Sequence, residues 1–121
     1  MDDRSAAPYA THLLRGFEAA AIRDRLLAIP VPGHTRGSVV YLLDDAFLFT
    51  GDSLAWSETR GDLVAFREVN WYSWSEQRRS LAKLVDYRFE WVLPGHGRPV
   101  NLPAGEMRQS LERCVEWMKA R

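Results

Sequence analysis

The sequence has one cysteine, no excess of charge of either sign and no long apolar run, and each absence excludes a class of protein. Cys114 alone cannot form an intrachain disulfide, which excludes a disulfide framework and favours a reducing compartment. The 16 basic and 16 acidic side chains cancel, so no net field attracts nucleic acid or an anionic membrane. No apolar stretch approaches the roughly 20 residues that span a bilayer, and Asp2-Asp3 replaces the basic start of a leader peptide. We therefore expect a soluble, cytoplasmic protein with no nucleic-acid or membrane partner.

The composition is that of an ordinary globular domain. Hydrophobic residues make up 46% and charged residues 26% of the 121 positions, which argues against disorder. A chain of this length forms one domain, and no internal linker or low-complexity tract divides it. We therefore expect a single domain over residues 1–121.

The first half of the chain favours strands. A helix over residues 6–14 is compatible with Pro8 only if the proline lies in the first turn. Residues 17–30 predict a strand pair that turns near Arg23-Asp24, because Pro30 and Pro32 cannot continue a helix. Residues 39–43 and 46–50 predict a hairpin, because Asp44-Asp45 between them tolerates the positive dihedrals of a tight turn.

The second half alternates loop, helix and strand. Residues 53–70 show no clean period and predict a long surface loop with one helical turn at most. A helix is expected from Ser73 or Ser75 to about residue 87, with Ser75 able to cap its first amides. A strand at 89–93 follows, and a final helix over 104–119 places five apolar side chains on one side, namely Met107, Leu111, Cys114, Val115 and Met118.

Two histidines and one aspartate each follow an apolar run, where a strand ends. They are His34 after Pro32-Gly33, Asp52 after Gly51, and His96 after Pro94-Gly95. Imidazole and carboxylate ligands suit zinc, iron or manganese, and a single cysteine argues against a structural thiolate site. A metal with an open position lowers the pKa of its water to roughly 7, which supplies hydroxide for hydrolysis.

Three motifs resemble, in order and surroundings, the last three metal-binding motifs of the metallo-β-lactamase-fold hydrolases. They are Pro32-Gly33-His34-Thr35-Arg36-Gly37-Ser38, Phe49-Thr50-Gly51-Asp52-Ser53 and Leu93-Pro94-Gly95-His96-Gly97. The resemblance implies an α/β fold, one half of an αβ/βα sandwich with a mixed sheet and helices on one face. It further implies a metal site, zinc or else iron or manganese, in which His34 and His96 each bind one ion and Asp52 bridges two. Hydroxide held there would attack an ester, thioester or similar bond.

The earlier His-x-His-x-Asp-His motif of that family is absent, since His12 is the one histidine before His34 and has no partner two residues away. The chain therefore resembles the C-terminal half of such a hydrolase, and truncation of a longer protein would explain the absence. Three protein ligands leave the metal short of donors, so the site could equally hold no metal. Half of a sandwich also exposes an apolar sheet face, which predicts a homodimer or a complex with a separate N-terminal half.

Each residue in these motifs also has an ordinary structural role open to it. His34 and His96 could be turn histidines, Asp52 could cap a turn, and Cys114 fits a small buried hydrophobe. Three loop arginines could bind an anionic substrate, although solvated side chains are the commoner case: Arg60, Arg67 and Arg98. Two functions therefore stay open, a small-molecule hydrolase completed by further ligands and a non-catalytic assembly module that keeps the fold.

Overall fold

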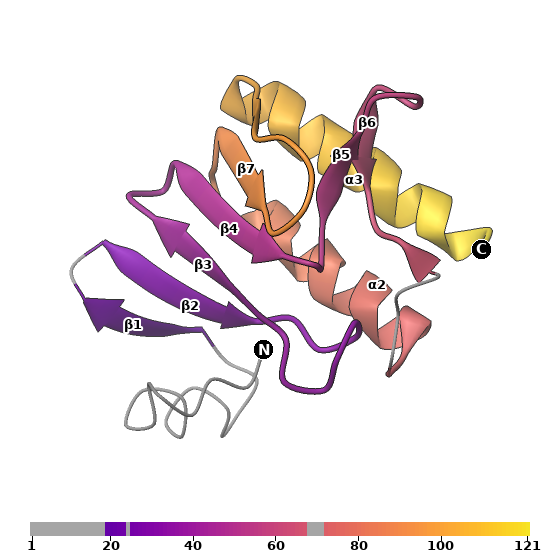
Figure 1. Ribbon diagram of the computed structural model, residues 1–121. Coiled ribbons are helices and arrows are strands. Elements are labelled where there is room, and N and C mark those ends of the chain that lie inside the picture. Colours follow the sequence, from indigo (N-terminus) through magenta and orange to yellow (C-terminus); the bar gives the residue numbers. More distant parts are fainter. Residues whose placement is uncertain (1–18, 24, 68–71) are drawn as a thin grey trace.

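A computed structural model describes residues 19–23, 25–67 and 72–121, which form a mixed sheet with helices on one face (Figure 1). The main sheet has six strands in the order β1-β2-β3-β4-β7-β8, and a smaller sheet pairs β5 with β6. All neighbouring strands are antiparallel except β4 and β7, which run parallel. The strands are β1 (Ala20–Arg23), β2 (Leu26–Pro30), β3 (Val39–Leu43), β4 (Phe47–Gly51), β5 (Ala55–Ser57), β6 (Asp62–Val64), β7 (Trp91–Pro94) and β8 (Val100–Asn101).

The first four strands follow the sequence prediction. The expected pair over residues 17–30 is β1 and β2, and the expected hairpin over 39–50 is β3 and β4. Between the hairpin strands, Asp44 and Asp45 have φ values of 56° and 51°. Two successive positive φ values match the twist that a short antiparallel connection requires, which is why this Asp-Asp pair sits there.

The parallel pairing of β4 with β7 positions the ends of both strands side by side. Phe47 pairs with Trp91, and Gly51 pairs with Pro94 at the carboxyl ends of the two strands. The loops that carry Asp52 and His96 therefore leave the sheet at the same edge. The antiparallel strand β8, which follows the His96 loop, was not predicted because it is only two residues long.

The predicted long surface loop over residues 53–70 is wrong for its described part. Strands β5 and β6 form an antiparallel hairpin there, with Leu54, Leu63 and Ala65 in the core. Each strand has three residues, so neither shows a periodicity that could be recognised in the sequence. The residues that pack this hairpin onto the domain lie on the final helix, far away in the chain.

The predicted helices are found with one difference at a cap and one at an end. Helix α2 (Trp74–Lys83) continues as the 3-10 helix η3 (Leu84–Asp86), and helix α3 (Ala104–Lys119) has the predicted bounds. The N-cap of α2 is Ser73 rather than Ser75, because the Ser73 hydroxyl accepts a hydrogen bond from the Glu76 amide. The helix expected over residues 6–14 lies outside the described residues.

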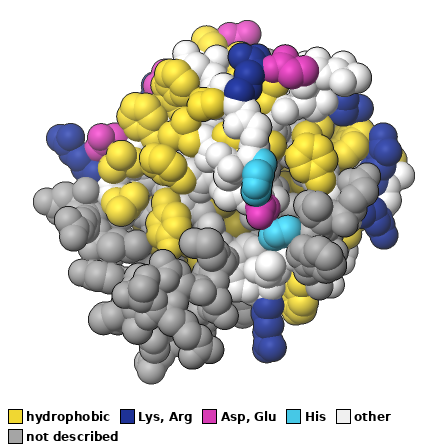
Figure 2. All heavy atoms as spheres, viewed as in Figure 1, with side chains coloured by type: hydrophobic (Ala, Val, Ile, Leu, Met, Phe, Trp, Pro, Cys, Tyr) yellow, Lys and Arg dark blue, Asp and Glu magenta, His cyan; other side chains and the backbone are white. Residues whose placement is uncertain are grey.

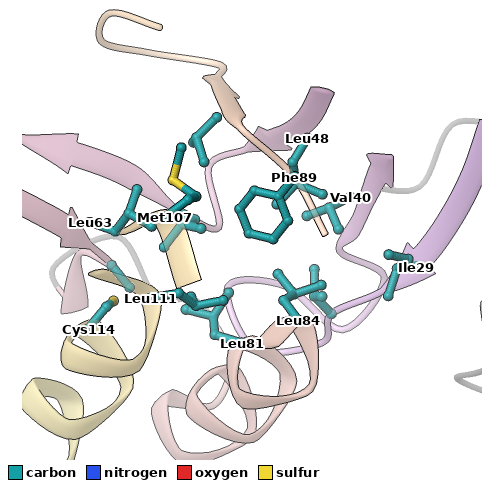
Figure 3. Packing of buried hydrophobic residues seen from close by; sticks show 14 of the residues in the cluster. Ile29, Val40, Leu48, Leu63, Leu81, Leu84, Phe89, Met107, Leu111 and Cys114 are labelled. Carbon is teal, nitrogen blue, oxygen red and sulfur yellow. The ribbon is translucent and has the colours of Figure 1, made fainter. Parts of the chain in front are cut away.

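The hydrophobic core lies between the sheet and the two helices (Figure 3). Val40 and Leu48 from the sheet face Leu81 of α2 and Leu111 of α3. All four side chains are fully buried. Burial raises the pKa of the Cys114 thiol to about 12, so this cysteine is the small buried hydrophobe that its place on the helix indicated. The core thereby uses one face of the sheet.

The other face of the sheet is also apolar. Because side chains alternate along a strand, the neighbours of the core residues point away from the helices, among them Tyr41, Phe47, Phe49 and Trp91. Phe49 is 41% exposed, and the rings of Phe47 and Trp91 stack with centroids 6.3 Å apart. Figure 2 shows hydrophobic side chains gathered over this face. Among the described residues, no helix is long and apolar enough to cross a membrane.

Candidate metal centre

His34 lies in a tightly bonded loop between β2 and β3. The Val31 amide donates to the Ser38 carbonyl across the base of the loop, and the Thr35 amide donates to the Ser38 hydroxyl. Gly33 has a φ of 154° and lies directly against Gln77, where no side chain would fit. The loop holds the imidazole of His34 only 13% exposed, with Nε2 toward the surface site.

Asp52 follows β4 in a turn that is closed by hydrogen bonds between neighbouring residues. The Ser53 amide donates to the Thr50 carbonyl, and the Thr50 hydroxyl donates to the Leu54 carbonyl at 2.6 Å. Gly51 has a φ of 54°, a left-handed conformation that suits glycine. The carboxylate of Asp52 is thus presented at the surface beyond the sheet edge, about half exposed.

His96 follows β7 in a loop that lies on the Asp52 turn. The Gly95 amide donates to the Gly51 carbonyl at 2.8 Å, which joins the two loops directly. A Cβ atom at Gly95 would lie 3.4 Å from Oδ1 of Asp52, so an added side chain would be in contact with the carboxylate. The imidazole of His96 is 92% exposed.

The three predicted residues lie together, with the carboxylate between the two imidazoles. Nε2 of His34 is 3.6 Å from Oδ2 of Asp52, and Nδ1 of His96 is 3.1 Å from Oδ1. In Figure 2 the two imidazoles flank the carboxylate on the molecular surface. Each carboxylate oxygen therefore faces a different histidine, an arrangement that suits a carboxylate shared between two cations.

Helix α2 and its N-cap hold two of these loops through residues that the sequence did not connect with the site. The Ser73 amide donates to the Gly33 carbonyl, and the Ser80 hydroxyl donates to the Pro32 carbonyl at 2.7 Å. The Gln77 amide group donates to the Ser53 carbonyl at 3.0 Å. These residues recur at i, i+4 and i+7 on one helix face. This repeat of polar residues along one face of an amphipathic helix was the feature of the sequence that could have indicated their role.

Two further polar features lie at or next to the site. Nδ1 of His34 is buried without a hydrogen-bond partner among the described residues. Arg98, two residues beyond His96, forms an ion pair with Glu58 from the β5–β6 connection. Arg60 and Arg67 lie elsewhere, beside helix α3, and His12 lies outside the described residues.

The donors among the described residues do not form a complete metal shell. Within the described part of the chain, no three His, Cys, Asp or Glu side chains converge closely enough to hold one metal ion. Each side of the site has one imidazole nitrogen and the one carboxylate oxygen of Asp52 that lies near it. The geometry therefore supplies two donors on each side of Asp52, where catalytic zinc commonly has three protein ligands.

Comparison with known proteins agrees with this topology. The sequence profile of the metallo-beta-lactamase superfamily matches residues 5–96 of the chain. The chain is 30% identical over 99 residues to the uncharacterized protein YobT of Bacillus subtilis, covering 74% of this chain and 41% of that protein. It is 29% identical over 79 residues to the beta-lactamase-like protein 2 homolog of Drosophila melanogaster, covering 65% and 24% respectively.

A solved structure shares the fold. An archaeal metallo-beta-lactamase superfamily protein from Sulfolobus tokodaii superposes with a TM-score of 0.58 at 25% identity, over 86% of this chain and 38% of that one. The chain thus spans less than half the length of these similar proteins. The profile match over most of the chain, together with the shared fold, shows that this chain belongs to the metallo-beta-lactamase superfamily.

Proposed function

We propose that this chain contributes His34, Asp52 and His96 to the centre of a metal-dependent hydrolase that cleaves ester, thioester or similar bonds. One observation carries the proposal: the Asp52 carboxylate lies between the two imidazoles and turns one oxygen toward each, at 3.6 Å and 3.1 Å. Superfamily membership supports the same chemistry. Neutral imidazole and carboxylate donors suit zinc, iron or manganese alike, and a pair of ions bridged by Asp52 fits the arrangement.

The donor set requires completion. One imidazole nitrogen and one carboxylate oxygen on each side would bind a metal ion only weakly if water supplied all the other ligands. We therefore propose that residues outside the described part, or a second chain, supply the remaining ligands. The buried Nδ1 of His34 agrees with this proposal. An unpaired buried nitrogen costs about 1–3 kcal/mol, and a ligating histidine normally donates its second N–H to an acceptor nearby.

Bound metal would supply Lewis acidity and an acidified water to the site. The residues of this chain would orient the reaction. Asp52 would hold the two metal positions at a fixed separation, and the rigid loop would keep His34 in place. His96 is 92% exposed and would face an approaching substrate. Arg98, held by Glu58 near His96, offers a guanidinium to a carboxylate or phosphate on the substrate.

The first test combines metal analysis with size-exclusion chromatography of the purified protein. We expect one to two metal equivalents per chain in the assembly that completes the site. His34→Ala, His96→Ala and Asp52→Asn should each lose metal. Asp44→Asn and Asp45→Asn serve as controls, because each removes an exposed carboxylate from the turn between β3 and β4, outside the site.

Activity is then measured on a chromogenic ester and a thioester with metal added. Loss of hydrolysis in the three site variants, with the two controls active, would support the proposal. A folded protein that binds negligible metal in every assembly would contradict it. That outcome would favour the alternative, a non-catalytic module that retains the fold for assembly.

A further inference from the structure

A pocket of about 500 Å³ lies beside the C-terminal end of helix α3, between that helix and the β5–β6 hairpin. Its lining includes Arg60 from the hairpin turn, Phe66 and Arg67 after β6, and Trp117 and Arg121 from the end of the chain. It shares no residue with the His34, Asp52 and His96 site. Its volume falls in the range of pockets that hold small ligands.

The three guanidinium groups in this pocket are held by tryptophan rings. Arg60 lies over the ring of Trp117 at 4.9 Å from its centroid, and Arg121 lies over the same ring at 4.6 Å. Arg67 lies 5.6 Å from the ring centroid of Trp74 and also donates to the Arg121 carbonyl. Cation–π contact restrains the plane of each guanidinium while its N–H edge stays able to donate.

The two tryptophans contact each other, and one of them, Trp74, is also held by a hydrogen bond. Their rings meet edge to face with centroids 6.4 Å apart, and Nε1 of Trp74 donates to the Met118 carbonyl at 3.2 Å. The three arginines are exposed, but each guanidinium lies over a tryptophan ring that packs against the other tryptophan. An arrangement of this kind binds at lower entropic cost than three solvated arginines would.

No described carboxylate side chain forms an ion pair with any of these three arginines. Six other described cations do have such partners: Arg25, Arg79, Arg88, Arg98, Arg113 and Lys119. The negative end of the α3 dipole favours one nearby cation. Arg67 contacts an oxygen of the terminal carboxylate of Arg121, so the three guanidinium groups leave a smaller net positive charge in the pocket, which an anion could neutralise.

We propose that this pocket binds a small organic phosphate with a planar apolar part, of the size of a mononucleotide. A phosphate group carries close to two negative charges at neutral pH and accepts paired hydrogen bonds from guanidinium groups. Phe66 is 46% exposed in the wall of the pocket and gives the planar part a ring to stack on. The phosphate group of such a ligand therefore matches the arginines, and its planar part matches Phe66.

The test is titration calorimetry of the chelator-treated protein, so that phosphate has no metal to bind. The probes are adenosine monophosphate, adenosine and inorganic phosphate. We expect the affinity to fall in the order adenosine monophosphate, inorganic phosphate, adenosine. Arg60→Gln and Arg67→Gln should each weaken binding of the monophosphate about tenfold, because each removes a charged hydrogen bond.

Phe66→Ala should weaken binding of adenosine monophosphate and leave binding of inorganic phosphate unchanged. Arg36→Gln and Arg108→Gln are matched controls, because both remove an exposed arginine outside the pocket, and circular dichroism verifies folding of every variant. No binding of either phosphate by the unaltered protein would overturn the proposal. Equal losses in the control variants, or adenosine binding as tightly as its monophosphate, would overturn it as well.

Discussion

Gly33 shows how one missing side chain positions the candidate site. A Cβ atom at this position would lie 2.2 Å from both Cα and Cβ of Gln77, and the φ of 154° is one that other residues rarely adopt. The glycine allows the His34 loop to lie directly on helix α2. The position of Gly33, the residue before the candidate ligand His34, is therefore as constrained as that of His34 itself.

Replacing Gly33 with alanine should destabilise the protein by about 3 kcal/mol, because backbone strain and overpacking both oppose the added methyl group. Gly105→Ala is the control, since a Cβ there meets nothing within 4 Å and alanine favours the helix. Urea denaturation of the two variants measures the difference. Equal stability would mean that the loop moves away from the helix at little cost.

Asp62 provides the clearest effect of pH on folding. Its side chain is 14% exposed, and both carboxylate oxygens accept hydrogen bonds from the Arg113 guanidinium, at 2.7 Å to 3.1 Å. This hydrogen bonding to Arg113 holds the pKa of Asp62 below its ordinary value, with a further contribution from the Ser110 hydroxyl. A lowered pKa in the folded protein means that the unfolded chain takes up a proton first.

The stabilisation from Asp62 should therefore be complete above about pH 4, the pKa of an unfolded aspartate, and should disappear as the pH falls through the lower folded value. Asp62→Asn should cost about 2 kcal/mol at pH 7 and progressively less in acid. Denaturation across this pH range measures both, with Asp44→Asn as the exposed control. A difference that stays constant with pH would contradict the assignment.

At the scale of elements, helix α2 organises the candidate site. Its residues Ser73, Gln77 and Ser80 bond to carbonyl groups of the loops that carry His34 and Asp52. The helix therefore fixes two loops that are 18 residues apart in the chain relative to each other. The buried polar face of α2 has a positioning role that an apolar face could not supply, because loop carbonyls need donors.

Ser73→Ala and Ser75→Ala form a matched pair that tests the start of this helix. Ser73 accepts the Glu76 amide at 3.1 Å, and its loss should cost about 1 kcal/mol. Ser75 is exposed and its hydroxyl makes a long, exposed hydrogen bond of 3.3 Å to the Ser73 hydroxyl, so its replacement should change stability by less than about 0.5 kcal/mol. Thermal melts distinguish the two. A larger effect for Ser75 would restore it as the cap.

The β5–β6 hairpin shows why some elements escape sequence reasoning. The Leu63 amide donates to the buried Ser110 hydroxyl on α3, and that hydroxyl donates to Asp62 at 2.7 Å. The partners lie 47 and 48 residues away in the sequence, so no local pattern reveals them. The hairpin over 39–50 was predictable from its turn residues and β-rich runs, and the strand pair over 20–30 because Pro30 and Pro32 exclude a helix.

At the scale of the whole molecule, the apolar face of the sheet that points away from the helices is the feature that indicates a partner. Tyr41, Phe47, Phe49 and Trp91 alternate with core residues and point away from the helices. Large apolar patches on soluble proteins usually mark an interface. The prediction of a homodimer or of a complex with an N-terminal half therefore remains a proposal with a defined surface.

Phe49→Thr should reduce association through this face, because it removes an exposed ring while keeping a residue that favours strands. We expect the unaltered chain to elute as a dimer, or with a co-expressed N-terminal partner, and the variant to shift toward a monomer in light-scattering measurements. Tyr72→Thr removes an exposed ring elsewhere and serves as the control. An unaltered chain that is monomeric and binds no such partner would contradict this role of the face.

The sequence by itself determined the strand ends that bear His34, Asp52 and His96, the two-aspartate turn and the bounds of α3, because these depend on neighbouring residues. Only the tertiary structure decided that Asp52 turns one oxygen to each histidine, since this follows from the parallel pairing of β4 with β7 and from the bond between Gly95 and Gly51. It also brought Arg60, Arg67 and Arg121 onto two tryptophan rings. Contacts between distant segments depend on how whole faces pack, and local sequence patterns do not encode that packing.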